Sequence, residues 1–370
     1  MKIGITGQNG FIGYHLTQTI KYKYSDYTIV PFQKSFFDNE SLLKDFVTSC
    51  DVIVHLAGVN RANTDKEVYE GNMLLTNALN KALINARFQG KLLFASSSQE
   101  KGDSAYGKAK KASRLLLEET MSTLEGSFSG LIIPNIFGPF CKPNYNSFVA
   151  TFCSKILNEE SPEIIKDTKV PLLYVGDLVN YIMEAIGKPN ESIVYLQPEV
   201  EIKVTEVLSL LKFFKSFYIE NNTIPKLNNS FELQLFNTFR SYLDIDEINP
   251  KPLVQHTDKR GFFSELIRTD IGGQFSYSTT LPGITRGNHF HTRKIERFMV
   301  IGGKAKISLR KIGSSKICDY ILDGEKPCYV DIPIWYTHNI TNIGNTPLIT
   351  AFWINEAYNP QDADTYFENV

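Results

Sequence analysis

The fold of the first half of the chain is decided by MKIGITGQNGFIG, residues 1–13. An apolar run over residues 2–6 has the length of a short strand, and three glycines follow it at the spacing GxxGxxG. Such glycines let the backbone turn tightly and approach a pyrophosphate, which the free N–H groups of the next helix attract. The stretch therefore predicts a dinucleotide-binding turn, whose contacts would come from Gly7, Gly10, Phe11, Ile12 and Gly13.

Strand and helix patterns alternate from this turn to about residue 180. Strand patterns occur at 2–6, 27–32, 51–57, 91–95 and 130–133, and helical periodicity occurs at 11–22, 41–48, 65–85 and 106–124. This order predicts an α/β domain of the Rossmann type, with a doubly wound parallel sheet and right-handed crossovers.

The pattern changes after a proline-containing stretch at 248–252, which we interpret as a linker. Short alternating strands such as 304–310 then follow one another between Gly, Pro and Asn turns, which is typical of an all-β sandwich or barrel. The segment 198–246 is largely helical and carries no motif, so we assign it to the first domain as a substrate lobe. The sequence thus predicts two domains, at 1–246 and 247–370.

Composition supports two packed domains and excludes several classes of protein. The chain has 370 residues, of which 42% are hydrophobic and 21% charged. A formal net charge of -1 gives no electrostatic basis for binding nucleic acid or an anionic membrane surface, and no apolar run reaches the roughly 18 residues of a membrane span. Five cysteines without a CxxC pair favour a reducing compartment, so we expect a cytoplasmic protein.

Proton-transfer chemistry is suggested by residues 106–110, Tyr-Gly-Lys-Ala-Lys. Tyr106 and Lys110 are four residues apart and share one face of the predicted helix. A nearby ammonium stabilises a phenolate, so we expect Lys110 to lower the pKa of Tyr106 and make it a proton donor near neutrality. Three serines end the preceding strand. In the reductase family that this pattern resembles, a hydroxyl at that strand end holds the substrate carbonyl, which implies Ser97 or Ser98 here.

The cofactor preference of such a site is set after the second strand, where a carboxylate binds the ribose 2′-OH and a cation suits a 2′-phosphate. Residues 31–34 read Pro-Phe-Gln-Lys and contain no acid. Lys34 therefore favours NADPH over NADH.

Together the glycine turn, the serine cluster and the Tyr106–Lys110 pair resemble the extended short-chain dehydrogenase/reductase family. The resemblance implies further cofactor contacts at Leu56, Ala57, Gly58 and Asn72. Residues 134–139 resemble a segment of the family's nucleotide-sugar enzymes, which implies that Asn135 binds substrate, although Ile132 stands where those enzymes often carry Arg.

One departure from the family separates two reactions. Dehydratases of this superfamily place an Asp-Glu pair after the catalytic hydroxyl, whereas Gln99-Glu100 follow the serines here. The resemblance therefore favours a ketone reductase over a 4,6-dehydratase.

A second chemical site is predicted in the all-β domain. The spacing G-x5-H-x-H-x4-E-x6-G over 283–303 resembles the first motif of the cupin (jelly-roll) family, and 333–342 resembles its second motif, with Trp335 replacing the usual Gly. His289 and His291 would project from one strand face, and Glu296 would return on the paired strand. Three imidazoles and a carboxylate suit Zn, Fe, Mn or Ni, with Zn²⁺ as the default, and the predicted ligands are His289, His291, Glu296 and His338. His15, His55 and His256 have no such partners and are interpreted as structural.

The cupin part also resembles deoxysugar 3,5-epimerases through D-x-R-G at 258–261 and G-x-x-R-G-x-H at 283–289. In those enzymes the His of R-G-x-H is the base, but His289 would here bind the metal. Either a metal acidifies the C–H beside a ketone, or another residue is the base, for which Tyr336 and Lys304 are candidates.

The order of the two domains resembles bifunctional capsular-polysaccharide enzymes, which join a reductase to a metal-binding cupin. This resemblance implies C3 epimerisation of a UDP-linked 4-keto-6-deoxy-N-acetyl amino sugar by the cupin and reduction at C4 with NADPH. The product would be UDP-2-acetamido-2,6-dideoxy-L-talose (UDP-6-deoxy-L-talosamine), on the route to UDP-L-FucNAc and capsule or O-antigen polysaccharide. A homodimer is expected by analogy. The alternatives are a non-catalytic dinucleotide sensor with a structural cupin, against which Tyr106 and Lys110 argue, and a nucleotide-sugar 4,6-dehydratase.

Overall fold

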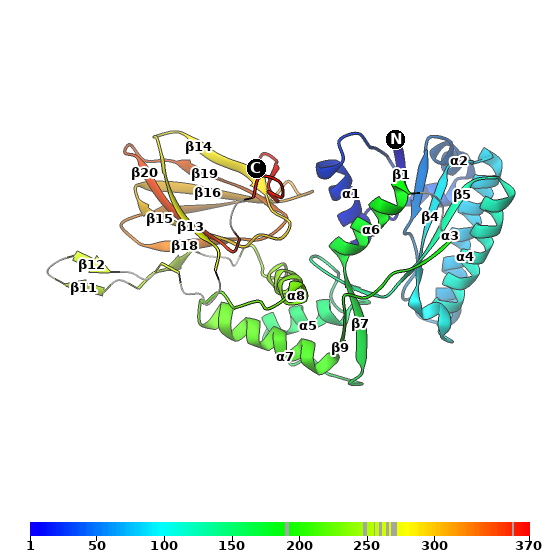
Figure 1. Cartoon of the computed structure of the whole chain (residues 1–370), viewed down its shortest axis with the longest axis horizontal. Coiled ribbons are helices and arrows are strands. Elements are labelled where there is room, and N and C mark those ends of the chain that lie inside the picture. The colour runs from blue at the N-terminus through cyan, green and yellow to red at the C-terminus, as the bar shows by residue number, and fades with distance from the viewer. Residues whose placement is uncertain are drawn as a thin grey trace. The chain divides into compact units, whose positions relative to one another are not determined.

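The computed structural model describes the chain as two compact units (Figure 1). The first comprises Met1–Thr151 and Glu163–Val207, and the second Phe152–Pro162 and Leu208–Val370. The described residues are 1–188, 192–246, 250–254, 256–258, 261–263, 266–267, 272–356 and 359–370, with backbone alone for 256–258 and 261–263. Part of the predicted linker and Lys259 and Arg260 of the epimerase-like motif lie outside the described residues.

The first unit is built on a six-stranded parallel sheet with the strand order β2-β1-β3-β4-β5-β8. Its strands are β1 (Lys2–Thr6), β2 (Thr28–Val30), β3 (Val52–His55), β4 (Lys91–Ser97), β5 (Ser127–Ile133) and β8 (Ile193–Tyr195). The order reverses direction between β1 and β3, and ligands of open α/β sheets bind at such a switch point, beyond the carboxyl ends of the strands.

Helices cover both faces of this sheet (Figure 1). They are α1 (Phe11–Lys23), α2 (Glu40–Thr48), α3 (Asp65–Ala86), α4 (Ala105–Thr123) and α6 (Val175–Gly187), with 3-10 turns η1 (Lys34–Asp38) and η2 (Ser98–Lys101). Successive strand residues enter opposite cores: Leu93 packs in one cluster with Ile182 of α6, and Leu92 in another with Leu79 of α3 and Leu117 of α4. The predicted doubly wound sheet is confirmed, with most element bounds within two residues.

A smaller sheet carries the segment that follows β5. It has the order β6-β7-β9, formed by β6 (Asn135–Phe137), β7 (Lys169–Tyr174) and β9 (Val200–Lys203). β6 runs parallel to β7, and β9 runs antiparallel to it. This sheet fixes Asn135 directly after the carboxyl end of β5.

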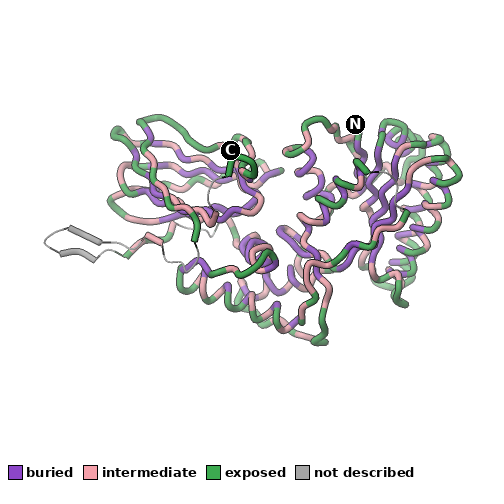
Figure 2. Tube along the Cα trace, viewed as in Figure 1, coloured by how far each residue is buried: buried purple, intermediate pink, exposed green. Residues whose placement is uncertain are grey.

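The second unit contains two five-stranded antiparallel sheets, as predicted for a cupin-like sandwich. One has the order β10-β18-β15-β20-β13 and the other β17-β16-β19-β14-β21. Figure 2 shows buried residues along the strands of this unit, and the core includes Val300, Leu309, Val330 and Ile340. The bounds are β10 (Lys251–Pro252), β13 (Gln274–Thr280), β14 (Thr285–Phe290), β15 (Glu296–Gly302), β16 (Lys304–Lys311), β17 (Ile317–Asp323), β18 (Cys328–Ile332), β19 (Tyr336–Asn342), β20 (Leu348–Ile354) and β21 (Tyr366–Phe367), besides the hairpin β11 (His256–Asp258) and β12 (Gly261–Phe263).

A helical segment packs on this sandwich and belongs to the second unit. It consists of α7 (Val204–Phe214), the π-helical turn η3 (Lys215–Glu220) and α8 (Ser230–Arg240). The first residues of α7 are assigned to the first unit, and the same holds for the first residues of another helix, α5 (Phe148–Leu157). Arg240 donates to the Ile332 carbonyl at 3.0 Å, and Asn237 donates to the Arg293 carbonyl at 3.0 Å. Residues 208–246 thus pack with the sandwich, whereas the sequence analysis places them in the first domain. Among the described residues, no helix is both long and apolar enough to cross a membrane.

Candidate functional site

Two of the three predicted glycines are required by the backbone of the turn between β1 and α1. Gly7 has a φ of +79°, and a Cβ there would lie 3.0 Å from the backbone N of Ala57. A Cβ on Gly13 would lie 2.1 Å from the Gly7 carbonyl oxygen. Gly10 is the N-cap residue of α1 and supplies no capping side chain, so the first N–H groups of the helix keep their capacity to bind a phosphate.

A cavity of about 230 Å³ lies beyond the carboxyl ends of the strands in the first unit. It brings together eight of the predicted site residues, which are Phe11, Ile12, Leu56, Gly58, Ser97, Tyr106, Lys110 and Asn135. Residues from the glycine turn, the end of β4, the start of α4 and β6 therefore share one site.

Tyr106 and Lys110 lie on one face of α4, as predicted. The Lys110 ammonium is 5.8 Å from the centre of the Tyr106 ring and 4.7 Å from that of Phe94, and Lys110 is only 4% exposed. A Cβ on Gly58 would lie 3.5 Å from Lys110 Nζ, so the loop after β3 runs directly against the lysine. Burial lowers the pKa of Lys110 to about 8.

The expected lowering of the Tyr106 pKa is wrong for this structure. Burial, with a smaller contribution from Tyr145, raises the pKa of Tyr106 to about 12. Desolvation of the phenolate dominates because the hydroxyl is taken out of water. Tyr106 is therefore a phenol at neutral pH, which is the form that can donate a proton.

The geometry separates the serines that the sequence left open. Ser97, the last residue of β4, lines the cavity, whereas Ser98 begins η2 and is not among the lining residues. Ser96 also lines the cavity, but its hydroxyl donates to the Glu100 carboxylate. We therefore favour Ser97 over Ser98 as the hydroxyl that faces a substrate.

Glu100 stands at one of the two positions where dehydratases carry the Asp-Glu pair, and it forms a buried ion pair with Arg114. Its carboxylate accepts from Arg114 Nε at 3.1 Å and from Arg114 Nη2 at 2.9 Å, and the two side chains are 8% and 9% exposed. Gln99 rather than Glu100 lines the cavity. In this part of the chain, the position after the serines thus presents an amide where a dehydratase presents carboxylates.

Other predicted residues lie outside the cavity lining. Asn72 is buried, accepts from the backbone N of Val59 at 3.1 Å and donates to the Val59 carbonyl at 2.7 Å, so it braces the loop that contains Ala57. Lys34 is exposed at the start of η1, after β2.

Ten of the eighteen residues that line the cavity were not among the predicted site residues. They include Gln99 of η2 and three residues of the loop before α5, which are Cys141, Asn146 and Ser147. The resemblance of the whole chain to bifunctional capsular-polysaccharide enzymes extends to loop 142–147 and could have pointed to Asn146 and Ser147. Two histidines that the sequence analysis interpreted as structural lie elsewhere in the first unit. His15 and His55 bond to Pro139 and Thr6 within the first unit, at 2.9 and 2.6 Å.

The four predicted metal ligands form one cluster in the second unit. One ligand atom from each of His289, His291, Glu296 and His338 lies within 4.8 Å of the others. His289 near the end of β14 is the register partner of His338 on β19. Glu296 begins β15, which is a strand of the other sheet and does not pair with β14. The prediction that Glu296 returns on the strand paired with β14 is therefore wrong.

The ligand atoms converge on one point without forming hydrogen bonds. Glu296 Oε2 lies 3.0 Å from His291 Nε2 and 3.3 Å from His338 Nε2. These contacts are short enough for ion pairs, but their angles do not suit hydrogen bonds, and all three atoms are buried without a hydrogen-bond partner among the described residues. Such convergence of unpaired donors is typical of metal ligation, and three imidazole nitrogens with one carboxylate oxygen fit Zn²⁺ or a similar divalent ion.

The electrostatics of Glu296 and His289 agree with this donor set, whereas at His291 burial is outweighed by the Glu296 carboxylate, which raises the pKa of the imidazole. Burial would raise the pKa of Glu296, but the imidazoles of His291 and His338 hold it well below its usual range. Burial and the neighbouring imidazoles lower the pKa of His289 to about 4. A carboxylate and a neutral imidazole are the protonation states that bind metal.

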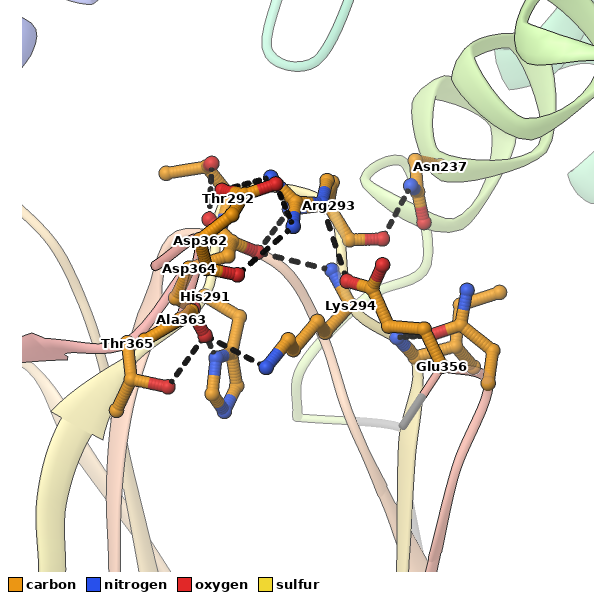
Figure 3. A network of polar contacts seen from close by, with 12 residues as sticks. Asn237, His291, Thr292, Arg293, Lys294, Glu356, Asp362, Ala363, Asp364 and Thr365 are labelled. Atoms are coloured by element: carbon orange, nitrogen blue, oxygen red, sulfur yellow. Dashed lines mark hydrogen bonds and ion pairs between the residues drawn. The ribbon is translucent and has the colours of Figure 1, made fainter. Parts of the chain in front are cut away.

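The C-terminal segment orients one ligand (Figure 3). His291 Nδ1 lies 2.5 Å from the Asp364 carbonyl oxygen, which can only accept, so Nδ1 carries the proton and Nε2 is free to bind. The Asp364 carboxylate accepts from the backbone N of Arg293 at 3.0 Å and from the Thr292 hydroxyl at 2.6 Å. Asp364 thereby ties the turn after His291 to the C-terminal segment.

The two candidate epimerase bases differ in place. Lys304 pairs with Asp323 at 3.2 Å and lies five residues before Leu309, the β16 partner of His338, so it stands at the far end of the sheet from the cluster. That candidate is wrong. Tyr336 is two residues from His338 on β19 and projects to the same face, and burial raises its pKa to about 12.

Family models match both parts of the chain. Residues 3–196 match the NAD-dependent epimerase/dehydratase family, and residues 256–366 match the polysaccharide biosynthesis C-terminal domain. A UDP-2-acetamido-2,6-beta-L-arabino-hexul-4-ose reductase from Pseudomonas aeruginosa is 33% identical over 369 residues, which cover 99% of this chain and 98% of the relative.

Solved structures resemble the chain over all or part of its length. The crystal structure of the capsular polysaccharide assembling protein CapF from Staphylococcus aureus is 36% identical, covers 100% of both chains and superposes with a TM-score of 0.64. The structure of RMD from Pseudomonas aeruginosa complexed with NADPH is 17% identical, covers 65% of this chain and 98% of that chain and has a TM-score of 0.56, which shows the fold alone.

Proposed function

The chain belongs to the NAD-dependent epimerase/dehydratase family, and from that premise we propose that it reduces the C4 ketone of a UDP-4-keto-6-deoxy-N-acetyl amino sugar with NADPH. The full-length similarity to a UDP-hexulose-4-ose reductase supports an NAD(P)-dependent reductase of a UDP-keto sugar. The observation that carries the proposal is the cavity shared by Ser97, Tyr106 and Lys110.

These side chains can do the proton half of a ketone reduction. NADPH, held by the glycine turn and by Lys34 at its 2′-phosphate, would supply the hydride that forms the new C4–H bond. Tyr106 donates its phenolic proton to the C4 oxygen as the carbonyl becomes an alcohol. Ser97 donates a hydrogen bond to the same oxygen, and the Lys110 ammonium stabilises the phenolate that remains.

The buried Glu100–Arg114 pair favours reduction over dehydration. A dehydratase needs carboxylate and carboxylic acid groups at the sugar, and Glu100 is bound elsewhere. A non-catalytic sensor would gain nothing from burying an ammonium at Lys110, since burial of a charge costs free energy.

Oxidation of NADPH, followed by absorbance with a UDP-4-keto-6-deoxy-N-acetylhexosamine, tests the reductase. We expect one NADPH consumed per sugar, with turnover lost in Tyr106→Phe and cofactor binding retained. Absence of NADPH consumption by the native chain would exclude the reduction, and bound cofactor without net consumption would favour the dehydratase.

We further propose that the second unit epimerises C3 of the same ketosugar, which would make the product UDP-2-acetamido-2,6-dideoxy-L-talose for UDP-L-FucNAc and capsule polysaccharide. His289, His291, Glu296 and His338 would hold Zn²⁺ or another divalent ion, which would supply Lewis-acid chemistry for the sugar carbonyl. The C3 hydrogen would leave as a proton to solvent, and the hydroxyl of Tyr336, which the sequence analysis named as a candidate base, would return a proton to the opposite face. The Tyr336 phenolate would then regain its proton from solvent.

The similarity of residues 256–366 to a polysaccharide biosynthesis domain supports this role. Limits of 1–246 and 247–370 for the two functional halves, and a homodimer, are part of the same proposal.

Deuterium exchange tests the epimerase half separately. In heavy water without NADPH, the ketosugar should gain deuterium at C3 in the presence of the full chain. Chelation should stop the exchange and added Zn²⁺ should restore it. Exchange at the uncatalysed rate with a metal-loaded protein would exclude the epimerase.

A further inference from the structure

One cavity of the second unit lies apart from both candidate sites. Its volume is about 330 Å³, and its lining includes Tyr218, Arg240, Lys251, Tyr329 and Asp331. None of the four metal-cluster residues and none of the residues of the first cavity line it. The cavity lies where the helical segment that ends in α8 packs on the sheet that contains β18.

One ion pair in the wall of this cavity is complete. The Asp331 carboxylate accepts from Arg297 Nε at 2.8 Å and from Arg297 Nη2 at 3.0 Å, and it also accepts from the Tyr218 hydroxyl. The Arg297 guanidinium lies 3.8 Å from the centre of the Tyr329 ring. The charges of Arg297 and Asp331 therefore cancel within the wall.

Arg240 adds a second buried cation that this pair does not neutralise. It is 2% exposed, and Nη2 donates to the Ile332 carbonyl at 3.0 Å. Its guanidinium carbon lies 5.4 Å from the centre of the Tyr218 ring. Nε and Nη1 are buried and have no hydrogen-bond partner among the described residues.

Among the described residues around this cavity, the arrangement leaves one more buried cation than buried anion. A buried charge without a partner is costly, and guanidinium N–H groups without acceptors add to that cost. An oxyanion in the cavity would supply both the counter-charge and the acceptors, because guanidinium matches the geometry of carboxylate and phosphate groups. Lys251 and Asp244 lie at the exposed rim of the cavity and carry opposite charges. Among the described residues, the buried Arg240 therefore gives the site a net positive charge.

We propose that this cavity binds the phosphate or carboxylate group of a small organic anion, with Arg240 as its buried partner. The cavity falls within the size range of small-molecule sites, which begins at about 300 Å³. Tyr218, Tyr242 and Tyr329 in its lining offer aromatic faces to the body of the ligand.

Equilibrium dialysis of the full chain tests the site, with inorganic phosphate and succinate as probes at matched ionic strength. We expect saturable binding of at least one of them, and the stronger of the two identifies the class of anion. Arg240→Gln should weaken that binding at least tenfold, which also separates the cavity from any phosphate bound at the glycine turn.

A second variant keeps the test decisive if Arg240→Gln does not fold. Lys251→Glu reverses a charge at the exposed rim and should weaken binding at least threefold. Lys326→Glu makes the same change at an exposed position outside the lining and should leave affinity unchanged. Affinity that is equal in the native chain and both cavity variants, or no saturable binding of either probe, would overturn the proposal.

Discussion

The two candidate sites differ in how closely the protein brings their functional groups together. In the first unit, Tyr106 and Lys110 line an open cavity of about 230 Å³ on a single helix turn, and a large ligand would have to complete the site. In the second unit, four ligand atoms from two sheets converge within 4.8 Å, and one ion would complete the site. The Tyr106–Lys110 pair of the first site is local in sequence, whereas the cluster in the second unit depends on the sandwich and on the C-terminal segment.

The comparison predicts that substitutions in the first site reduce turnover, whereas substitutions in the second site prevent the metal from binding. Loss of a reacting group in the open cavity should leave binding intact. Loss of any group in the cluster should weaken the binding of metal itself. The predictions below test this difference.

The largest effect is expected for Tyr106→Phe, which removes the proton donor. Loss of a positioned general acid typically costs about 10²- to 10⁴-fold in rate, and the ring that remains should keep the affinity for NADPH. Turnover and cofactor binding are measured side by side, with Tyr69→Phe as the control on a partly exposed helix position. Equal loss of turnover and binding would mean that Tyr106 is structural.

Glu296→Gln should nearly abolish metal binding. It removes the only carboxylate of the cluster and its charge, so affinity should fall by more than the roughly 100-fold that losing an outer partner costs. Competition with a chromogenic chelator measures the affinity, and Glu325→Gln is the exposed control. Unchanged affinity would show that the cluster is not a metal site.

Asp364→Ala should weaken metal binding by about 10- to 100-fold, the range for a partner that orients a ligand. The change frees the turn after His291, which the Asp364 carboxylate holds. Asp362→Ala removes a carboxylate of the same segment that pairs with Arg293, and it should have little effect. If the two variants bind metal equally, the orienting role of Asp364 is wrong.

Lys34→Ala should reduce the preference for NADPH over NADH by about tenfold, the effect of one charge-assisted hydrogen bond. The ratio of kcat/KM for the two cofactors measures it. Lys101→Ala, at the end of η2, is the control. An unchanged ratio would make Lys34 a solvated surface charge.

The smallest effect concerns pH. The buried ammonium of Lys110 has its pKa lowered from 10.5 to about 8. Between those values the unfolded chain binds more protons at this residue than the folded one, so its contribution to stability rises with pH. From pH 8 to pH 9 the gain is about 1 kcal/mol. Urea unfolding of the native chain and Lys110→Met should differ by this slope, and parallel slopes would contradict it.

Much of both sites could be predicted from sequence because their residues lie in short motifs. Gly7, Gly13 and the Tyr106–Lys110 pair depend on one turn and one helix, and the spacing of those elements is visible in the sequence. The sequence could not choose between Ser97 and Ser98, because the choice depends on where β4 ends.

Long-range features escaped prediction for a physical reason. Three features depend on residues that are distant in sequence. They are the sheet that carries Glu296, the hydrogen bond between His291 and Asp364, and the burial of Arg240 Nε and Nη1 without a hydrogen-bond partner among the described residues. The sign of the Tyr106 pKa shift was also missed, because burial is a property of the fold and not of residue spacing.

The central claim, that two sites act in turn on one sugar, is tested most directly by one labelling measurement. The full chain is incubated with the UDP-4-keto-6-deoxy-N-acetylhexosamine and NADPH in heavy water, and the product is examined by NMR. We predict one NADPH oxidised per sugar, deuterium at C3 and protium at C4. Reduction that leaves protium at C3 would contradict the account, because the ketone would then be reduced without epimerisation.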